Sequence, residues 1–463
     1  MNYLTKEIKK TFSSSTDLII KNIKDITIIF LESLCSSDKI NEYILKVLSL
    51  KKTSKDLNSI LVGPNTKEVS TLEEITNLLL NGFTIIIKDK CYAVETKGDL
   101  VRSITEPTTE PDLHGPKDSF NESIQTNLGL IKRRIKSPDL INLDLNIGSY
   151  SKTKVSILYI KSIAEDELVK KVQKKLEAIN IDGILDAGNI KQLIGQEDSE
   201  LFPTTQLTER PDKAALDLLE GKIIILVDGS PLVISMPSFL VDFINPSVDT
   251  YSKNININFI KVLRFLCLII TLFLPSFYIA LISYNQSSIP LDLLINFAMQ
   301  RSSVPIPSVI ECLVILVLCA ILRESDIRFP SSYGSSISIV GALVMGDAAV
   351  SAGIVSPIMI IVVAVTYITS MVFTDMEFIN SFRHIRFLSL LLVAILGLFG
   401  FYMSIFITLI HLCSLESIGK PYTYPLAPFD KIYFHKTIFR TSKKKDKFRS
   451  KLLTKKNFRK EGD

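Results

Sequence analysis

Hydrophobic residues are distributed in two different ways along the chain. Up to about residue 258, short apolar runs alternate with charged and polar residues, as in soluble α/β proteins. Between residues 259 and 413 apolar residues dominate and form five stretches, at 262–283, 304–322, 337–351, 354–373 and 387–412. The first, fourth and fifth of these are about long enough to cross a bilayer as helices. The pattern predicts a soluble first half followed by a multi-pass α-helical membrane domain.

The soluble half contains the same order of elements twice. Each copy opens with an apolar, strand-like run followed by helical spacing of apolar residues. Further on, Leu79–Gly82 leads into the apolar run Phe83–Ile87, and Leu218–Gly221 leads into Ile223–Val227 and a turn at Asp228–Ser230. The glycine is typical of a helix end and the turn is typical of a β-hairpin. We therefore predict an α/β, two-lobed N-terminal domain that arose by internal duplication.

These patterns divide the chain into six expected parts. They are an N-terminal tail (1–23), a first α/β lobe (24–101), a connecting segment with one helix (102–152), a second α/β lobe (153–245), a helical membrane domain (259–413) and a basic C-terminal tail (414–463). A basic block after a membrane segment is usually solvated. It is typical of a segment that stays on the side of the membrane where the chain is made and binds anionic lipid there.

The N-terminal residues lack the apolar core of a signal peptide, so both termini are expected on one side of the membrane. Five full crossings would separate the termini. We therefore expect either the third or the fifth stretch to be re-entrant, and four crossings. The fifth contains Gly397 and Gly400.

Side chains that could support catalysis or hold a metal are scarce. The six cysteines form no Cys-x-x-Cys pair, and none of the four histidines has a second histidine at metal-binding spacing. We expect no enzyme activity, no metal and no cofactor. A nucleic-acid partner is also not expected, because no aromatic platform accompanies the basic tail.

Two acidic residues, Glu311 and Asp347, lie within apolar stretches, where charge is costly and often functional. Each is a candidate for an ion path or an intramembrane polar site. The structural alternatives are that Glu311 pairs with a hydroxyl or with Arg301, and that Asp347 caps a broken helix. Small residues that let helices approach closely form a candidate packing interface, either within one subunit or between subunits. They are Gly341, Ala342, Gly346, Ala349 and Gly353.

Several ordered motifs resemble those of the A subunits of GerA-type nutrient germinant receptors of bacterial spores. In the soluble half they are Phe202-Pro203-Thr204, Thr208–Asp212, and Leu219–Gly221 followed by Leu226–Pro231. In the apolar half they include Leu274-Pro275, Leu322-Arg323-Glu324, Ser338–Gly341 and Ala348–Gly353. The resemblance extends from about residue 24 to residue 430.

The resemblance implies a role in nutrient-responsive spore germination. Family members act with a transporter-like B subunit that senses the nutrient and with a lipoprotein C subunit, in the spore inner membrane. The A subunit is thought to form a homo-oligomeric, ligand-gated channel that releases cations. Both termini of this chain would then face the spore core.

The chain also departs from the family pattern. Two further glutamates that often follow the position of Glu311 are here Leu316 and Ala320, and His114 replaces the usual arginine before Gly115. With fewer acids in the membrane, a non-conducting scaffold subunit is an alternative to a cation channel. A secondary transporter is a third possibility, although it predicts inverted repeats in the membrane half.

Overall fold

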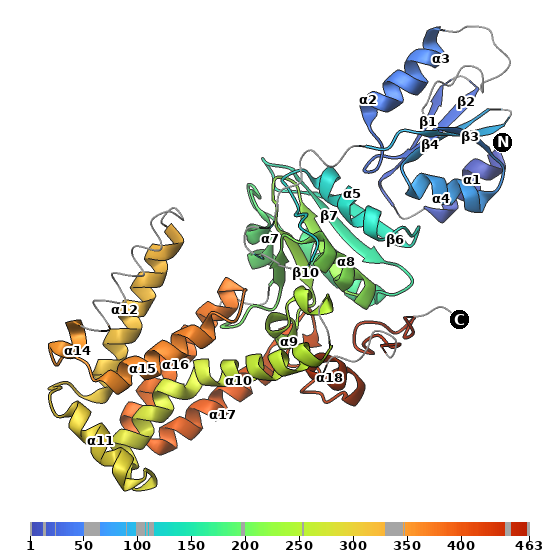
Figure 1. Ribbon diagram of the computed structural model, residues 1–463. Helices are drawn as coiled ribbons and strands as arrows, with labels where there is room; N and C mark the ends of the chain where they lie inside the picture. Colours follow the sequence, from blue (N-terminus) through green and yellow to red (C-terminus); the bar gives the residue numbers. More distant parts are fainter. Residues whose placement is uncertain are drawn as a thin grey trace.

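The computed structural model describes residues 2–12, 15–23, 25–50, 65–88, 90–98, 107, 110, 115–195, 200–251, 254–328, 346, 348–439 and 446–460. Two α/β lobes and a helical part follow one another along the molecule (Figure 1). The second lobe lies between the first lobe and the helical part, and the C-terminal segment returns to the second lobe.

The first lobe is built on a five-stranded antiparallel sheet with the strand order β1-β2-β4-β5-β3. Its elements are α1 (Asn2–Thr11), β1 (Leu18–Ile23), β2 (Ile26–Leu31), α2 (Ser37–Ile40), a π-helical turn (Asn41–Leu45), α3 (Lys46–Leu50), β3 (Thr66–Val69), α4 (Leu72–Leu80), β4 (Phe83–Ile87) and β5 (Cys91–Glu95). Ile29 and Ile85 pack toward α1 and α4, whereas Ile28 and Ile86 pack toward α2 and the π-helical turn. Because helices cover both faces, the central strands carry buried apolar residues on both of their faces.

The second lobe repeats this arrangement with the strand order β6-β7-β9-β10-β8. Its elements are α5 (Ile124–Arg134), β6 (Leu140–Ile147), β7 (Thr153–Ile160), α6 (Asp166–Glu177), α7 (Ala187–Ile194), β8 (Gln206–Thr208), α8 (Pro211–Glu220), β9 (Ile223–Val227), β10 (Val233–Met236) and α9 (Leu240–Ile244). Ile223 and Ile225 face the cluster formed by α6 and α7, and Ile224 and Leu226 face α5 and α8.

The two sheets therefore share one strand order, and the helices cover equivalent faces. Gly82 follows α4 with φ +84°, and Gly221 ends α8 with φ +99°. The predicted order of helix, glycine and hairpin is thus confirmed in both lobes. The buried ion pair between Asp17 and Lys132 joins the first lobe to α5.

Two predicted boundaries of the lobes are wrong. Residues 1–23 are not a tail, because Ile8 of α1 is fully buried and β1 pairs with β2, with Leu18 opposite Leu31. The segment 102–152 contains the expected helix, but β6 pairs with β7 along all eight of its residues. Both missed strands lie at sheet edges, where polar residues interrupt the apolar pattern.

The helical part contains α10 (Asn254–Ile279), a π-helical turn (Ala280–Tyr284), a 3-10 turn (Gln286–Ser288), α11 (Leu291–Arg301), α12 (Ser308–Arg328), α14 (Ala349–Ser351), α15 (Pro357–Ser370), α16 (Met376–Leu396) and α17 (Leu398–Ser414). After it come β11 (Glu416–Ser417), β12 (Lys420–Pro421) and α18 (Lys431–Ile438).

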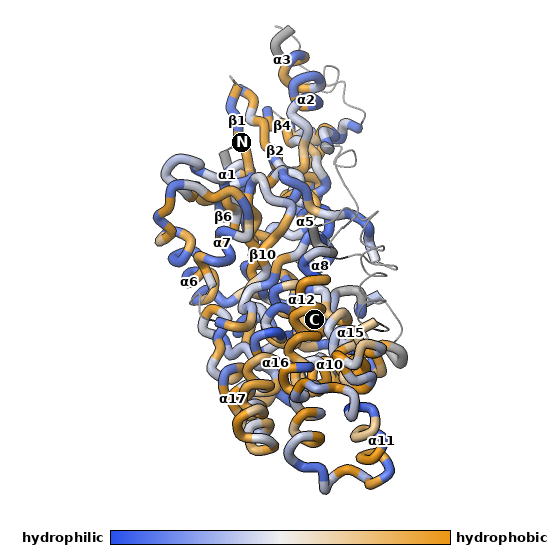
Figure 2. The backbone as a smooth tube through the Cα atoms, turned by 90° about the vertical axis from the view of Figure 1, so that its left-hand side faces the viewer, coloured by the Kyte–Doolittle hydropathy of each residue, from blue (hydrophilic) through white to orange (hydrophobic). Residues whose placement is uncertain are grey.

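Two helices of the described residues, Ile257–Tyr284 and Met376–Leu396, are long and apolar enough to cross a membrane. Figure 2 shows hydrophobic residues concentrated along the helical part, whereas both lobes are mixed. Large apolar side chains point outward from α10, α15, α16 and α17, including Phe259, Ile361, Ile395, Phe406 and Ile410. This surface is not covered by any other described part of the chain.

The fifth apolar stretch is not a single helix. Gly397 has φ +60° and separates α16 from α17, which fold back on one another. At Gly400 a Cβ atom would lie 2.1 Å from the Leu392 carbonyl oxygen, so α17 can approach α16 only because this residue has no side chain. A continuous apolar run does not show where the chain reverses direction. Here Gly397 and Gly400 allow the reversal between α16 and α17. Of the third stretch, the described residues are Gly346 and 348–351.

The basic C-terminal segment is not a solvated tail over its described residues. Leu453 is fully buried against Phe239 and Val241 of the second lobe. Lys436 binds Glu220 at 2.8 Å, and Lys460 binds the same carboxylate. The acidic partners lie more than 200 positions earlier in the chain, so local composition could not identify them.

Candidate functional site

Glu311 lies in the first turn of α12, at the end of the helical part that is distant from the lobes, and only 1% of it is exposed. Its Oε1 atom accepts hydrogen bonds from the backbone N–H of Ser356 at 2.7 Å and from the Ser356 hydroxyl at 2.6 Å. Ser356 is the N-cap residue of α15, and its own side chain does not cap that helix. The carboxylate of Glu311 therefore caps α15, at the helix end where negative charge is stabilised.

The second carboxylate oxygen of Glu311 has a different environment. Oε2 lies 3.9 Å from Nε of Arg301, at the end of α11. Glu311 Oε2, Arg301 Nε and the Tyr278 hydroxyl are all buried, and none of them makes a hydrogen bond to a described residue. Tyr278, on α10, interacts electrostatically with both Arg301 and Glu311. Buried polar atoms are nearly always hydrogen-bonded to protein or to water, so this cluster is equipped for a further small polar ligand.

The chemistry available to this cluster is limited. It offers a carboxylate, a guanidinium and a phenol, but no activated nucleophile. Among the described residues, no group of three His, Cys, Asp or Glu side chains could hold a metal ion. The free carboxylate oxygen can accept a hydrogen bond from water or contact a dehydrated cation. The arrangement therefore suits contact with ions or water.

The other candidate residues have different positions. Asp347, Gly341 and Ala342 lie outside the described residues. Gly346 is exposed, and a Cβ atom there would meet no described residue within 4 Å. Gly353 has φ +65°, and a Cβ atom would meet the Ser303 carbonyl oxygen at 3.0 Å. Ala349 packs against the apolar cluster of α12 and α15. Gly353 thus serves a turn that touches the loop after α11.

The sequence did not predict an aromatic cluster where the second lobe meets the helical part. Phe243 of α9 stacks on Phe378 of α16 with ring centroids 5.2 Å apart. Phe202 lies 5.8 Å from Phe378 and 6.4 Å from Tyr422, which is fully buried. Lys191 of α7 also binds Glu377 of α16 at 2.5 Å. The sequence signal was indirect: Phe202 and Tyr422 lie in motifs that resemble the family, which did not indicate that they meet.

The motif Thr208–Asp212 has a structural role beside this junction. Arg210 is 1% exposed and donates from Nε and a terminal nitrogen to the two oxygens of Asp212, at 3.0 and 2.9 Å. Tyr251, just before α10, donates to the same carboxylate at 2.8 Å. Burial would raise the pKa of Asp212, but the hydrogen bonds from Arg210 and Tyr251 outweigh it and lower that pKa. Burial and the bond to Asp212 raise the pKa of Tyr251 to about 12.

Known proteins resemble this chain over most of its length. The family model described as Bacillus/Clostridium GerA spore germination protein matches residues 6–452. Spore germination protein KA of Bacillus subtilis (strain 168) is 38% identical over 451 residues, which are 94% of this chain and 83% of that protein. Spore germination protein GerLA of Bacillus cereus is 33% identical over 439 residues, 91% of this chain and 89% of that protein.

Among solved structures, the N-terminal domain of the A subunit of the Bacillus megaterium spore germinant receptor GerK3 matches with a TM-score of 0.40 and 30% identity. It covers 52% of this chain and 95% of that chain. The family model covers nearly the whole sequence, and the two relatives are 38% and 33% identical over 83% and 89% of their own length. The chain belongs to the GerA family of spore germination proteins.

Proposed function

We propose that this chain is the A subunit of a nutrient-responsive germinant receptor, and that copies of it form a cation-conducting oligomer in the spore inner membrane. Family membership supports the role in germination. The outward-facing apolar side chains of α10, α15, α16 and α17 need lipid or other subunits to cover them. A multi-pass helical domain in a membrane would cover these side chains and would suit a receptor subunit. This role requires no catalysis.

The proposed orientation has both termini on the core side. It is supported by the packing of the C-terminal segment, since Leu453 lies against Phe239 of the soluble half. α10 and α16 begin beside the lobes, whereas α15 begins at the distant end, where Ser356 contacts Glu311. An even number of crossings returns the chain to the lobes, as this orientation requires.

The proposed partners are a transporter-like B subunit and a lipoprotein C subunit. In this arrangement the aromatic junction of Phe202, Phe243, Phe378 and Tyr422 transmits changes in the soluble lobes to α16. The junction is buried and closely packed, so a displacement of α9 would also displace α16.

The observation that supports conduction most directly is Glu311, a buried carboxylate with one oxygen that no described residue satisfies. In a ring of identical subunits, one such residue becomes a ring of negative charges, which favours cations. Leu316, at a position where family members often have another glutamate, is buried in an apolar cluster, so Glu311 is the main acid of α12 within the apolar stretch.

A scaffold that does not conduct is the second candidate, and one observation favours it. Both oxygens of Glu311 face groups of the same chain, namely Ser356 and Arg301. Such contacts fit a residue that ties α12 to α15 and α11.

Substitution of Glu311 by glutamine tests the two roles. The amide oxygen can still accept the hydrogen bonds from Ser356, but the charge is removed. If the oligomer conducts cations, Glu311→Gln should still assemble, but its reversal potential in a salt gradient should move toward the value of a non-selective pore. The potential is recorded in planar bilayers with and without the B and C subunits. Asp292→Asn, at an exposed acid of α11, is the matched control and should leave selectivity unchanged. Unchanged selectivity in well-assembled Glu311→Gln would assign Glu311 to the scaffold role.

A further inference from the structure

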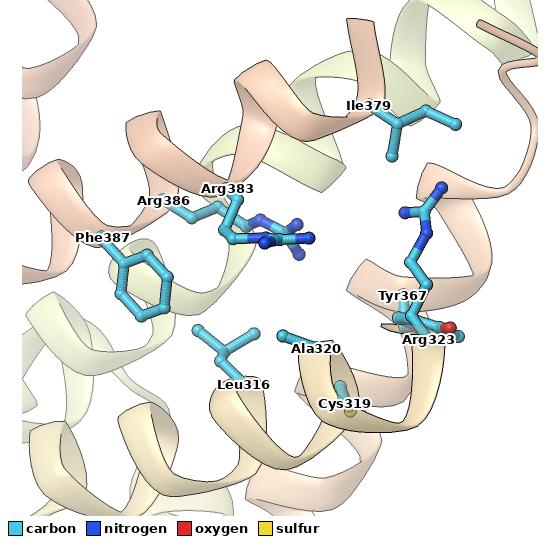
Figure 3. Close-up of a pocket in the computed structure, with 9 residues that line it drawn as sticks. All are labelled: Leu316, Cys319, Ala320, Arg323, Tyr367, Ile379, Arg383, Arg386 and Phe387. Carbon is cyan, nitrogen blue, oxygen red and sulfur yellow. The ribbon is translucent and has the colours of Figure 1, made fainter. Parts of the chain in front are cut away.

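Three arginines converge on one cavity of the helical part, at the end near the soluble lobes. Arg323 comes from α12, and Arg383 and Arg386 come from successive turns of α16 (Figure 3). Tyr367 of α15 completes the polar lining, and Leu316 and Phe387 form part of the apolar wall. The lining residues come from three separate segments of the sequence, and only the packing of α12, α15 and α16 brings them together.

The three guanidinium groups have only weak or local contacts. Arg323 lies 3.4 Å from the Met376 sulfur, Arg383 donates to the Asn380 amide oxygen at 3.3 Å, and Arg386 donates to the Phe382 carbonyl oxygen at 3.3 Å. Within the described ranges, none of the three forms a salt bridge with a carboxylate. The nearby acid Glu377 is engaged by Lys191 of the second lobe.

Three other half-buried or buried arginines among the described residues are neutralised by carboxylates. Arg264 binds Asp249 at 2.7 Å, Arg134 binds Asp118 at 2.6 Å, and Arg210 binds Asp212 at 2.9 Å. The arginine cavity is therefore exceptional among the described residues, because three like charges gather without an acid. Like charges in a partly desolvated site repel one another unless an anion is bound between them.

Helix dipoles do not explain these positions. Arg323 lies before the last turn of α12, which ends at Arg328, so it is outside the turn in which the dipole stabilises positive charge. Arg383 and Arg386 lie in the interior of α16, more than one turn from either end, where the dipole effect has faded. Their convergence on the cavity thus needs a different cause.

We propose that this arginine cavity binds a phosphate-type oxyanion, either the headgroup phosphate of an anionic phospholipid or free inorganic phosphate. Planar guanidinium groups match phosphate oxygens with paired hydrogen bonds. The space between the side chains, about 30 Å³, admits one or two oxygen atoms of such a group. Leu316 and Phe387 beside the arginines suit the first carbons of a lipid. The site does not depend on whether the chain conducts ions.

The test uses the full chain, purified in neutral detergent and reconstituted into nanodiscs. Phosphatidylglycerol and phosphatidylcholine are compared by native mass spectrometry of retained lipid and by thermal unfolding, and inorganic phosphate is titrated separately. Binding that requires phosphatidylglycerol identifies a headgroup, and a stabilisation by inorganic phosphate alone identifies the free ion. Either result supports the proposal if Arg386→Gln weakens the binding of that probe. The expected loss in affinity is roughly tenfold for one lost charge-assisted hydrogen bond.

Two further variants complete the test. Arg383→Gln replaces a side chain with only a local contact to Asn380, so it gives a folded protein even if Arg386→Gln does not, and it should weaken binding similarly. Lys431→Gln removes one exposed positive charge on α18 and should leave binding unchanged. The proposal would be overturned if Arg386→Gln and Arg383→Gln bound phosphatidylglycerol and inorganic phosphate as well as wild type does. It would also be overturned if Lys431→Gln lost as much binding as the two arginine variants.

Discussion

At the residue scale, buried charges in the soluble half are matched by opposite charges that lie within hydrogen-bonding distance. Lys222 is 3% exposed and contacts Asp242 at 2.8 Å and Asp217 at 3.2 Å. Burial alone would lower the pKa of Lys222, but the two carboxylates outweigh it and raise that pKa. The pair of Arg210 with Asp212 follows the same rule. Removing one member of such a pair leaves a buried charge without compensation, which costs about 3–5 kcal/mol.

The pair of Arg210 and Asp212 should make the stability of the protein depend on pH. The pKa of Asp212 is lowered in the folded protein, so its contribution to stability is fully present above the ordinary carboxyl pKa of about 4. This contribution is lost as pH falls through the lower pKa of the folded state. Asp212→Asn should therefore be less stable than wild type by about 3 kcal/mol at pH 7. The difference should narrow below about pH 4, as wild-type Asp212 takes up a proton.

Thermal unfolding of the full chain between pH 7 and pH 3 measures this difference. Glu42→Gln, at an exposed position of the first lobe, controls for the loss of a surface charge. A gap between wild type and Asp212→Asn that stays constant down to pH 3 would contradict the assignment of this pair.

At the element scale, the helical part depends on close approaches that only small residues permit. The ring of Tyr284 would lie 2.9 Å from a Cβ atom at Gly397, and the Leu392 carbonyl would lie 2.1 Å from one at Gly400. The Tyr284 hydroxyl also donates to the Ala394 carbonyl oxygen, which fixes the π-helical turn after α10 against the α16–α17 turn. The hairpin is therefore defined by contacts between α10, α16 and α17, and not by apolar content.

Gly400→Ala should open or shift this hairpin. The added methyl group overlaps backbone that has no rotamer to move, so we expect a loss of about 1–3 kcal/mol. The melting temperature in detergent measures it. Gly346→Ala is the matched control, since no described residue lies within 4 Å of its Cβ position. Equal melting temperatures for both variants would mean that α16 and α17 are less closely packed than described.

At the scale of the whole molecule, the C-terminal segment closes a loop from the helical part back to the second lobe. The cluster of Phe239, Val241, Tyr424 and Leu453 and the ion pairs of Glu220 hold it there. If the helical part lies in a membrane, this contact requires both ends of the chain to be on one side.

Labelling of single cysteines tests that orientation. Tyr3 is 73% exposed and Lys451 is also exposed, so Tyr3→Cys and Lys451→Cys can react with an impermeant maleimide. The background replaces Cys35 and Cys413, the native cysteines that are not buried. We expect both positions to react from the core side of sealed vesicles only. Reaction of the two positions from opposite sides would exclude the C-terminal contact.

Assembly provides a second test at this scale. Gly346→Leu should block formation of the oligomer while expression stays normal, because small residues permit close contact between helices in lipid. The described part of the subunit leaves open space at Gly346, so a loss of assembly would place the contact between subunits. Chemical cross-linking followed by size analysis measures it, with Gly346→Ala as the conservative control. Normal assembly of Gly346→Leu would remove this position from an interface.

The sequence by itself determined the division into a mixed half and an apolar half, and the helix–glycine–hairpin order of each lobe. These features depend on periodicity and turn chemistry within a few residues, which a sequence displays directly. The edge strands β1 and β6 were missed because polar residues interrupt their apolar runs, although the alternation of apolar and polar residues in β6 is itself typical of a strand. The family resemblance was also readable, because motifs such as Thr208–Asp212 are continuous.

Only the tertiary structure decided which distant groups meet. Glu311 finds its bonding partner 45 positions away, Lys460 finds Glu220 at a separation of 240, and Arg323 reaches the same cavity as Arg386. The sequence named Glu311 and proposed a hydroxyl or Arg301 as its partner, but it could not select Ser356. The physical reason is that such contacts depend on how helices and sheets pack across the chain, and packing is a property of surfaces that form only after the elements have folded.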